Sequence, residues 1–202
     1  DERFVVEDRW VIPLQYQGDE LEITGQLLWI PGPSPLPWYL LTAALIGLGA
    51  FVGLRTWWGR GIAALLGALI LTDVFHLVGI LGARAGGPDL ASVGSNLLYS
   101  VVAWSVGIAG ITMLLKAKRD GLFAAIFSGV LLAVFGGLQD LGVLSHSQVP
   151  FAWGEASARV FVTLSIGLGV GVTVWSVLAL WKLGAFAGLT AWGRTSPADP
   201  TA

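Results

Sequence analysis

Long stretches without a charged residue constrain this sequence more than any other feature. Residues 23–54, 90–115, 121–139 and 160–181 contain no Asp, Glu, Lys or Arg, and 61–82 is interrupted only by Asp73 and His76. A helix needs ~20 mostly apolar residues to cross a bilayer. With 55% hydrophobic and 12% charged residues, the sequence predicts an all-α integral membrane protein. Its five-transmembrane-helix bundle should comprise helices at 38–55, 61–82, 94–116, 121–144 and 157–182.

The basic residues predict the orientation of these helices, because short loops rich in Lys and Arg stay in the cytoplasm. An extracytoplasmic N-terminus leaves seven basic residues on the inner side and four on the outer side. The inner set is Arg55, Arg60, Lys116, Lys118, Arg119, Lys182 and Arg194, and the outer set is Arg3, Arg9, Arg84 and Arg159. We therefore expect a multi-pass protein of the plasma membrane with its C-terminus in the cytoplasm. A net charge of −2 gives no reason to expect nucleic acid as a partner.

The N-terminal residues have a different character. Residues 1–30 hold seven of the thirteen acidic residues and alternate as strands do on either side of Gln17-Gly18-Asp19, which predicts an extracytoplasmic β-hairpin. A Pro-rich linker at 31–37 should be stiff and extended, the bundle should occupy 38–182, and 183–202 should form a cytoplasmic tail. No methionine or signal sequence stands at the start, so we expect a removed signal peptide or a longer preceding β-domain.

Short motifs in this region resemble those of a known group. They are Trp10-x-x-Pro13-Leu14, then Gly25-x-Leu27-x-Trp29, then the proline-rich run that ends at Trp38 before the hydrophobic helices. The pattern is similar to that of poorly characterised actinobacterial polytopic membrane proteins with a secreted β-rich domain, some of them associated with CopC/CopD-type copper-handling proteins. The resemblance implies a role near copper handling.

Polar residues inside the predicted bundle gather toward its outer side. Asp73 and His76 lie one turn apart on the second helix, and at 1.5 Å per residue they stand about 13 and 9 Å from its outer end. Asp140 lies near the outer end of the fourth helix with His146 just beyond it, and the third helix contributes Asn96, Tyr99 and Ser100 at the same level. Ionisable groups in hydrocarbon are rare unless they pair or serve a function. The pattern favours a cavity open to the outside and disfavours a channel or pump.

The sharpest functional hypothesis for these residues is a metal site. Asp73, His76, Asp140 and His146 offer imidazole and carboxylate ligands, which suit Zn(II) and Cu(II). Cu(I) is disfavoured, because Met113 is the one thioether and the chain has no cysteine. The function predicted is a non-enzymatic membrane protein that binds a divalent metal, with copper or zinc as the cofactor, as an accessory to metal handling.

Two other interpretations stay open. The polar groups could simply satisfy one another, with Asp73 bonding His76, Asp140 pairing with Arg159 and His146 solvated, in which case the protein is a structural or accessory subunit of a larger membrane protein complex. They could also relay protons. Because no catalytic triad, phosphate loop or dinucleotide fingerprint is present, an enzyme ranks third, below the metal-binding protein and the structural subunit.

Overall fold

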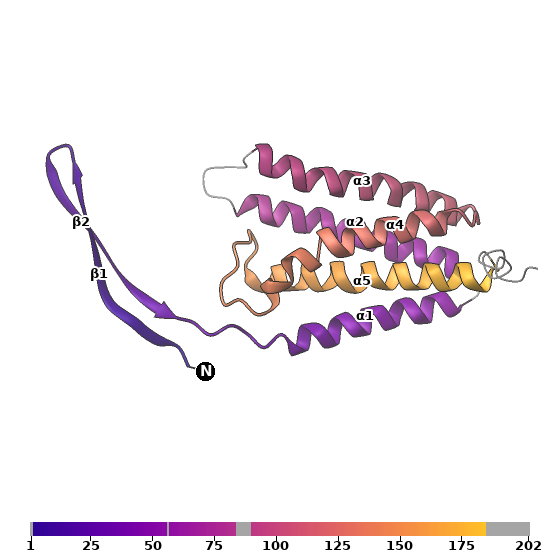
Figure 1. Cartoon of the computed structure of the whole chain (residues 1–202), viewed down its shortest axis with the longest axis horizontal. Helices are drawn as coiled ribbons and strands as arrows, with labels where there is room; N and C mark the ends of the chain where they lie inside the picture. The colour runs from indigo at the N-terminus through magenta and orange to yellow at the C-terminus, as the bar shows by residue number, and fades with distance from the viewer. Residues whose placement is uncertain (1, 56, 84–89, 185–202) are drawn as a thin grey trace, which may run out of the picture.

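The molecule consists of a bundle of long helices and a β-hairpin that projects from one end of it (Figure 1). The computed structural model describes residues 2–55, 57–83 and 90–184, so most of the expected tail at 183–202 lies outside the described residues. The order along the chain is β1 (Phe4–Tyr16), β2 (Asp19–Trp29), α1 (Leu36–Leu54), α2 (Trp58–Gly82), α3 (Leu90–Leu115), α4 (Gly121–Phe135), the 3-10 helix η1 (Leu138–Leu144) and α5 (Glu155–Lys182).

The helices have the length and composition of membrane spans. Four of those in the described ranges, α1, α2, α3 and α5, are long and apolar enough to cross a bilayer, and α4 with η1 makes a fifth if the bent pair is one span. The continuous helix expected over 121–144 is wrong, because the chain bends by 44° between α4 and η1. The bend falls at Gly136 and Gly137, where Gly137 leaves helical geometry with φ −138° and ψ −62°. Consecutive glycines lower helix propensity and let the axis turn here.

Helix α5 packs on α1 through paired glycines. A Cβ on Gly167 would lie 2.7 Å from that of Leu45, and one on Gly53 would lie 3.1 Å from the ring of Trp175. Trp175 also donates its indole N–H to the Ile46 carbonyl at 3.0 Å. Glycines of α1 and α5 thus form one close interface, as small residues do between membrane helices.

We predict that this interface tolerates no side chain at Gly49. A leucine there would collide with the ring of Trp175, and overpacking of this kind costs about 1–3 kcal/mol. The Gly49→Leu variant should therefore unfold at lower temperature in detergent, followed by circular dichroism. Gly47→Leu is the matched control, because Gly47 lies two residues away on α1 and a Cβ added to it would meet nothing within 4 Å. Equal midpoints for the two variants would contradict the packing.

The predicted hairpin is confirmed. β1 and β2 pair antiparallel around a two-residue turn in which Gln17 and Gly18 both have positive φ, at 52° and 96°, as a type I′ turn requires. The register places one set of side chains on one face, with Trp10 packed across Gly25. Members of this apolar face are Trp10, Ile12, Leu14, Tyr16, Leu21 and Ile23.

Candidate functional site

A cavity of ≈ 270 Å³ opens among α2, α3, α4 and η1. It lies at the end of the bundle from which the hairpin extends, since Gly32 of the linker contacts the Ser145 carbonyl just after η1. Three of the four predicted ligands line it, together with polar residues expected on α3. The lining residues are Asp73, His76, Leu77, Ile80, Tyr99, Ser100, Phe135, Gly136, Gln139 and Asp140.

Asp73 is held on the buried side of this cavity. Asp73 is only 3% exposed, and Trp104 of α3 donates its indole N–H to Asp73 Oδ2 at 2.9 Å. The Ser100 side chain is within hydrogen-bonding reach of the same carboxylate. A Cβ on Gly136 would lie 2.5 Å from Asp73 Oδ1, so the end of α4 approaches the carboxylate closely only because this position is glycine. Asp73 thereby links α2, α3 and α4.

His76 faces Asp140 across the cavity. The Nε2 atom of His76 lies 3.6 Å from Asp140 Oδ2, with the side chains 5% and 38% exposed. This separation is longer than a normal N–H···O hydrogen bond. Asp140 reaches His76 from η1, where its backbone departs from helical geometry with φ −100° and ψ 17°. The two residues therefore form a pair that joins the buried interior to the cavity mouth.

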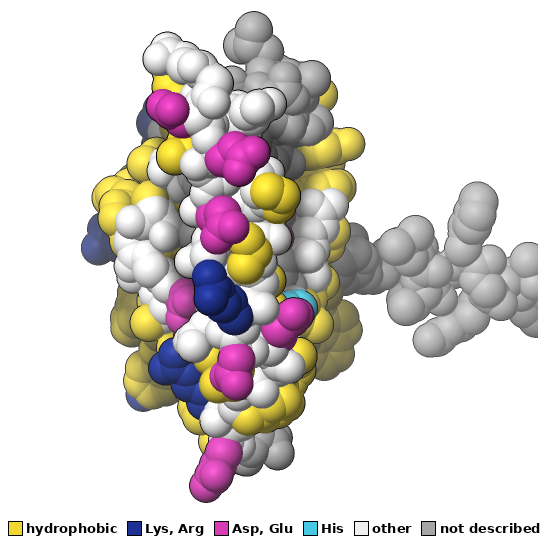
Figure 2. Space-filling model, turned by 90° about the vertical axis from the view of Figure 1, so that its left-hand side faces the viewer, with side chains coloured by type: hydrophobic (Ala, Val, Ile, Leu, Met, Phe, Trp, Pro, Cys, Tyr) yellow, Lys and Arg dark blue, Asp and Glu magenta, His cyan; other side chains and the backbone are white. Residues whose placement is uncertain are grey.

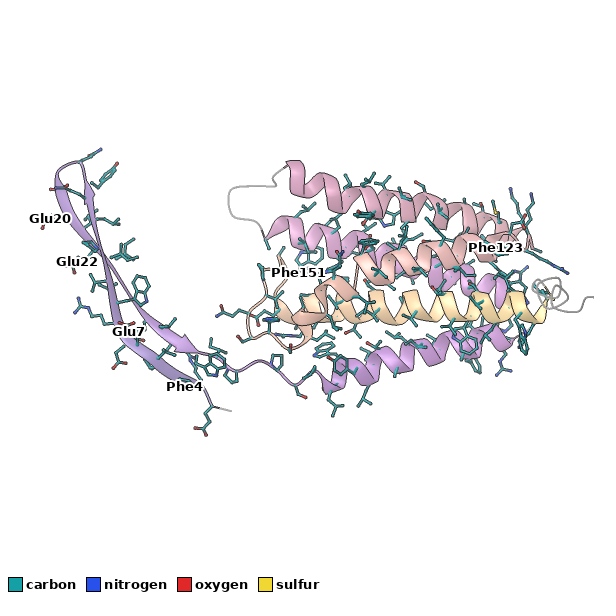
Figure 3. All side chains as sticks on the ribbon, in the orientation of Figure 1. Phe4, Glu7, Glu20, Glu22, Phe123 and Phe151 are labelled. Carbon is teal, nitrogen blue, oxygen red and sulfur yellow. The ribbon has the colours of Figure 1, made fainter. Side chains whose placement is uncertain are left out.

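An aromatic wall covers the other side of His76. The rings of Phe151 and Phe161 lie 5.9 Å and 6.5 Å from the imidazole, centroid to centroid, and Trp153 packs on both of them. The loop carrying Phe151 is fixed to α2 by the Ala152 N–H, which donates to the Gly79 carbonyl at 3.0 Å. Figure 3 shows Phe151 at the hairpin end of the bundle. His76 is thus closed off by apolar rings on one side and open to Asp140 on the other.

His146, the fourth predicted ligand, does not join the other three. It lines a neighbouring, more open cavity together with Asp140 and Gln148, and its Nδ1 bonds the Gly142 carbonyl.

The described side chains also include an unexpected arrangement around Arg159, which donates to the carbonyls of Val143 and His146 at 3.3 and 2.8 Å. The alternative pairing of Asp140 with Arg159 is therefore wrong, because both partners are engaged elsewhere.

Several residues of the site escaped the sequence interpretation. Trp104 stands four residues after Ser100 and shares its helix face, which is the signal that could have identified it. Phe151 comes from a loop whose path the helical pattern does not define, so no signal in the sequence places it against His76. The side chain of Asn96, expected at the same level, lies outside the described part of α3.

We predict a measurable role for the indole of Trp104. In Trp104→Phe the Asp73 carboxylate stays buried without its N–H donor, and an unsatisfied buried acceptor costs about 1–3 kcal/mol. Thermal unfolding in detergent should show this loss. The cost should shrink when Asp73 is also changed to leucine, since no carboxylate then needs the donor. Additive effects of the two substitutions would argue against the bond.

Comparisons with known proteins give no independent guide. No family model, curated protein or solved structure matches the chain. The resemblance to actinobacterial membrane proteins associated with copper handling accordingly stays a prediction. Function has to be argued from the cavity and its chemistry.

Proposed function

We propose that the protein is a membrane protein that binds a divalent metal ion, copper or zinc, in the cavity between His76 and Asp140. With its N-terminus extracytoplasmic, as the basic residues favour, the cavity lies near the outer surface of the plasma membrane. Such a protein would serve as an accessory to metal handling, taking its ion from the outer side. The resemblance to proteins associated with copper handling agrees with this role.

The separation of the two side chains carries the proposal. Zinc lies about 2.0–2.2 Å from imidazole nitrogen and carboxylate oxygen, so two such ligands in a tetrahedral shell are about 3.3–3.6 Å apart. The 3.6 Å between His76 Nε2 and Asp140 Oδ2 is too long for a hydrogen bond and fits an ion between the two atoms. Asp73, one turn before His76, lines the same cavity.

The rest of the shell must come from weaker ligands. Among the described residues, no three His, Cys, Asp or Glu side chains come together as a group able to hold a metal ion. Tyr99 and Gln139 line the same cavity, and their oxygen atoms and water would fill the remaining positions. A site with two strong ligands and an open side suits reversible binding and release more than permanent structural storage.

Metal content of the purified protein tests the proposal. The full chain is loaded with Zn(II) or Cu(II) in detergent, desalted and measured by mass spectrometry, with His146→Ala beside the wild type. Near-stoichiometric metal in both would support the site, because His146 lies outside it. Metal-free protein after loading, or metal lost on changing His146, would overturn this assignment.

A second candidate function, an accessory subunit of a larger membrane complex, is favoured by the hairpin. Among the described residues nothing covers its apolar face, with Ile12 and Ile23 each 49% exposed, and a two-stranded hairpin is marginal in water by itself. Six acidic and two basic residues between positions 2 and 29 give it a net charge of −4. Figure 2, viewed from the hairpin side, shows Asp and Glu side chains exposed on this face. A second acidic copy would be repelled, so a basic protein partner fits best.

The two edges of the hairpin differ in their capacity to accept such a partner. Both register shifts insert their extra residue in β1, and Pro13 in the same strand lacks an N–H, so bulges and proline block its edge. β2 contains neither. Pro13 lies opposite Glu22 and has no N–H to donate to β2, so this is a pair without hydrogen bonds between its two residues. Such pairs alternate with hydrogen-bonded pairs in an antiparallel ladder, so the N–H groups of Glu22 and Thr24 point away from β1. We infer that a basic partner strand adds to the β2 edge.

Proline scanning distinguishes the edges. A peptide of alternating lysine and valine serves as the probe, and its binding to the full chain is followed by tryptophan fluorescence. Thr24→Pro should remove binding, whereas Val11→Pro, which alters the matching position on β1, should leave it unchanged. Equal effects of the two substitutions, or self-association without the peptide, would contradict the partner assigned to β2.

A further inference from the structure

A second cavity lies at the opposite end of the bundle from His76. Its volume is ≈ 420 Å³, and it forms where the α1–α2 connection meets the α3–α4 connection and the end of α5. Figure 3 shows Phe123, near the start of α4, at this end. The cavity is lined by Trp57, Trp58, Gly59, Arg60, Leu114, Leu115, Ala117, Lys118, Arg119 and Leu183.

Three cationic side chains surround this cavity. Arg60 comes from the first turn of α2, and Lys118 and Arg119 come from the turn between α3 and α4. No acidic residue is part of the lining, and across the described ranges none of the three cations lies within ion-pair distance of a carboxylate. Asp120 follows Arg119 in the chain but does not line the cavity, so the lining itself carries only positive charge.

Two helix N-termini add to the positive potential. α2 begins at Trp58 and α4 begins at Gly121, and neither has a side-chain cap for its first N–H groups. Uncapped N-termini carry partial positive charge and favour anions. The helix termini act together with the three cations, which are themselves the independent reason to expect an anionic ligand.

The rest of the lining is mostly apolar and lies at the end of the membrane-spanning helices. Trp57 is 49% exposed and Leu115 59% exposed, and tryptophan at the end of a membrane helix lies typically at the headgroup region. A ligand that fills the cavity would meet cations at its head and apolar side chains beside it. Anionic phospholipids have this combination, and basic pockets between membrane helices bind such headgroups.

We propose that this cavity binds a phosphate group, supplied by the headgroup of an anionic phospholipid. Arg60, Lys118 and Arg119 would contact the phosphate oxygens, and Trp57 and Trp58 would flank the glycerol and upper acyl chain. Arg guanidinium groups suit this role because their fixed N–H donors match phosphate oxygens. Free phosphate is the other source of the same chemistry.

Arg55 supplies a matched control. It lies in the α1–α2 connection, five residues before Arg60, yet its guanidinium stacks 4.2 Å from the centroid of the Phe51 ring and does not line the cavity. A general attraction of basic residues to an acidic membrane would depend on both arginines. A specific binding site in the cavity would depend on Arg60 and not on Arg55.

The experiment compares lipid binding to the full chain in detergent. Native mass spectrometry and thermal unfolding are measured with added phosphatidylglycerol, phosphatidylcholine or inorganic phosphate. Phosphatidylglycerol should bind and raise the unfolding midpoint more than phosphatidylcholine does. Removing a cation near an anionic headgroup should weaken binding about fivefold, so Arg60→Gln with Lys118→Gln should lose about 25-fold, while Arg55→Gln should not change it.

The arms of this experiment separate the outcomes. Stabilisation by phosphatidylglycerol alone supports a lipid headgroup, and equal stabilisation by inorganic phosphate supports the phosphate site with a soluble source. Equal binding of phosphatidylcholine, or an equal loss in Arg55→Gln and Arg60→Gln, would overturn the proposal. The single variant Arg60→Gln, whose side chain is exposed, keeps the test usable if the double variant fails to fold.

Discussion

Alanine in place of His76 is expected to lower the affinity for Zn(II) or Cu(II) by more than about 100-fold. Loss of a residue that only supports a metal ligand costs about 10–100-fold, and loss of the ligand itself should cost more. His76 supplies the one imidazole in the cavity, and neutral imidazole is the stronger of the two proposed ligand types for these ions. Asp140 alone would leave the ion with a single partly exposed carboxylate, which water outcompetes readily.

Isothermal titration of the purified chain in detergent checks this expectation. Asp140→Asn should weaken binding as well, because an amide oxygen carries no charge to neutralise the ion, whereas His146→Ala should bind as the wild type does. Thermal unfolding without metal shows whether each variant is folded. Binding that persists in a folded His76→Ala variant would place the metal elsewhere or exclude a site in this cavity.

The sequence predicted the helical side of this site well. Asp73 and His76 share one face of α2 because they are three residues apart, and their depth along the helix placed them beside Tyr99 and Ser100. The structure brings these residues to one cavity. Periodicity and rise per residue are local properties, and they determine which side chains stand at the same level in a bundle.

The positions of Asp140 and His146, which follow the bend after α4, could not be predicted in the same way. A continuous helix through Gly136 and Gly137 would carry Asp140 and His146 outward together, and the sequence therefore predicts both as ligands. The 44° bend instead sends Asp140 toward His76 and His146 to the neighbouring cavity. The sequence shows that two glycines can break a helix, but the direction of the break depends on packing against Asp73 and Ile166.

Arg159 ties the end of η1 to α5. It belongs to α5, is only 8% exposed, and donates to the carbonyls of Val143 and His146 at the C-terminal end of η1. The final carbonyls of a helix lack partners within the helix. A charged donor that reaches one of them, on Val143, and also the carbonyl of His146 just beyond η1 holds this end of η1 on α5, and hence holds Asp140 in front of His76.

Methionine at position 159 is therefore expected to destabilise the protein by about 3 kcal/mol, since hydrogen bonds from charged donors contribute about 1.5–3 kcal/mol each and both part-buried bonds are lost. Amide exchange should accelerate in 138–148 and stay unchanged in α3. Arg159→Lys should retain part of the stability, because one ammonium group lacks the reach of the guanidinium fork. Arg55→Met controls for loss of charge alone. Metal affinity should also fall in Arg159→Met, although this side chain touches neither proposed ligand. Unchanged amide exchange in η1 would contradict the role of Arg159 in positioning Asp140.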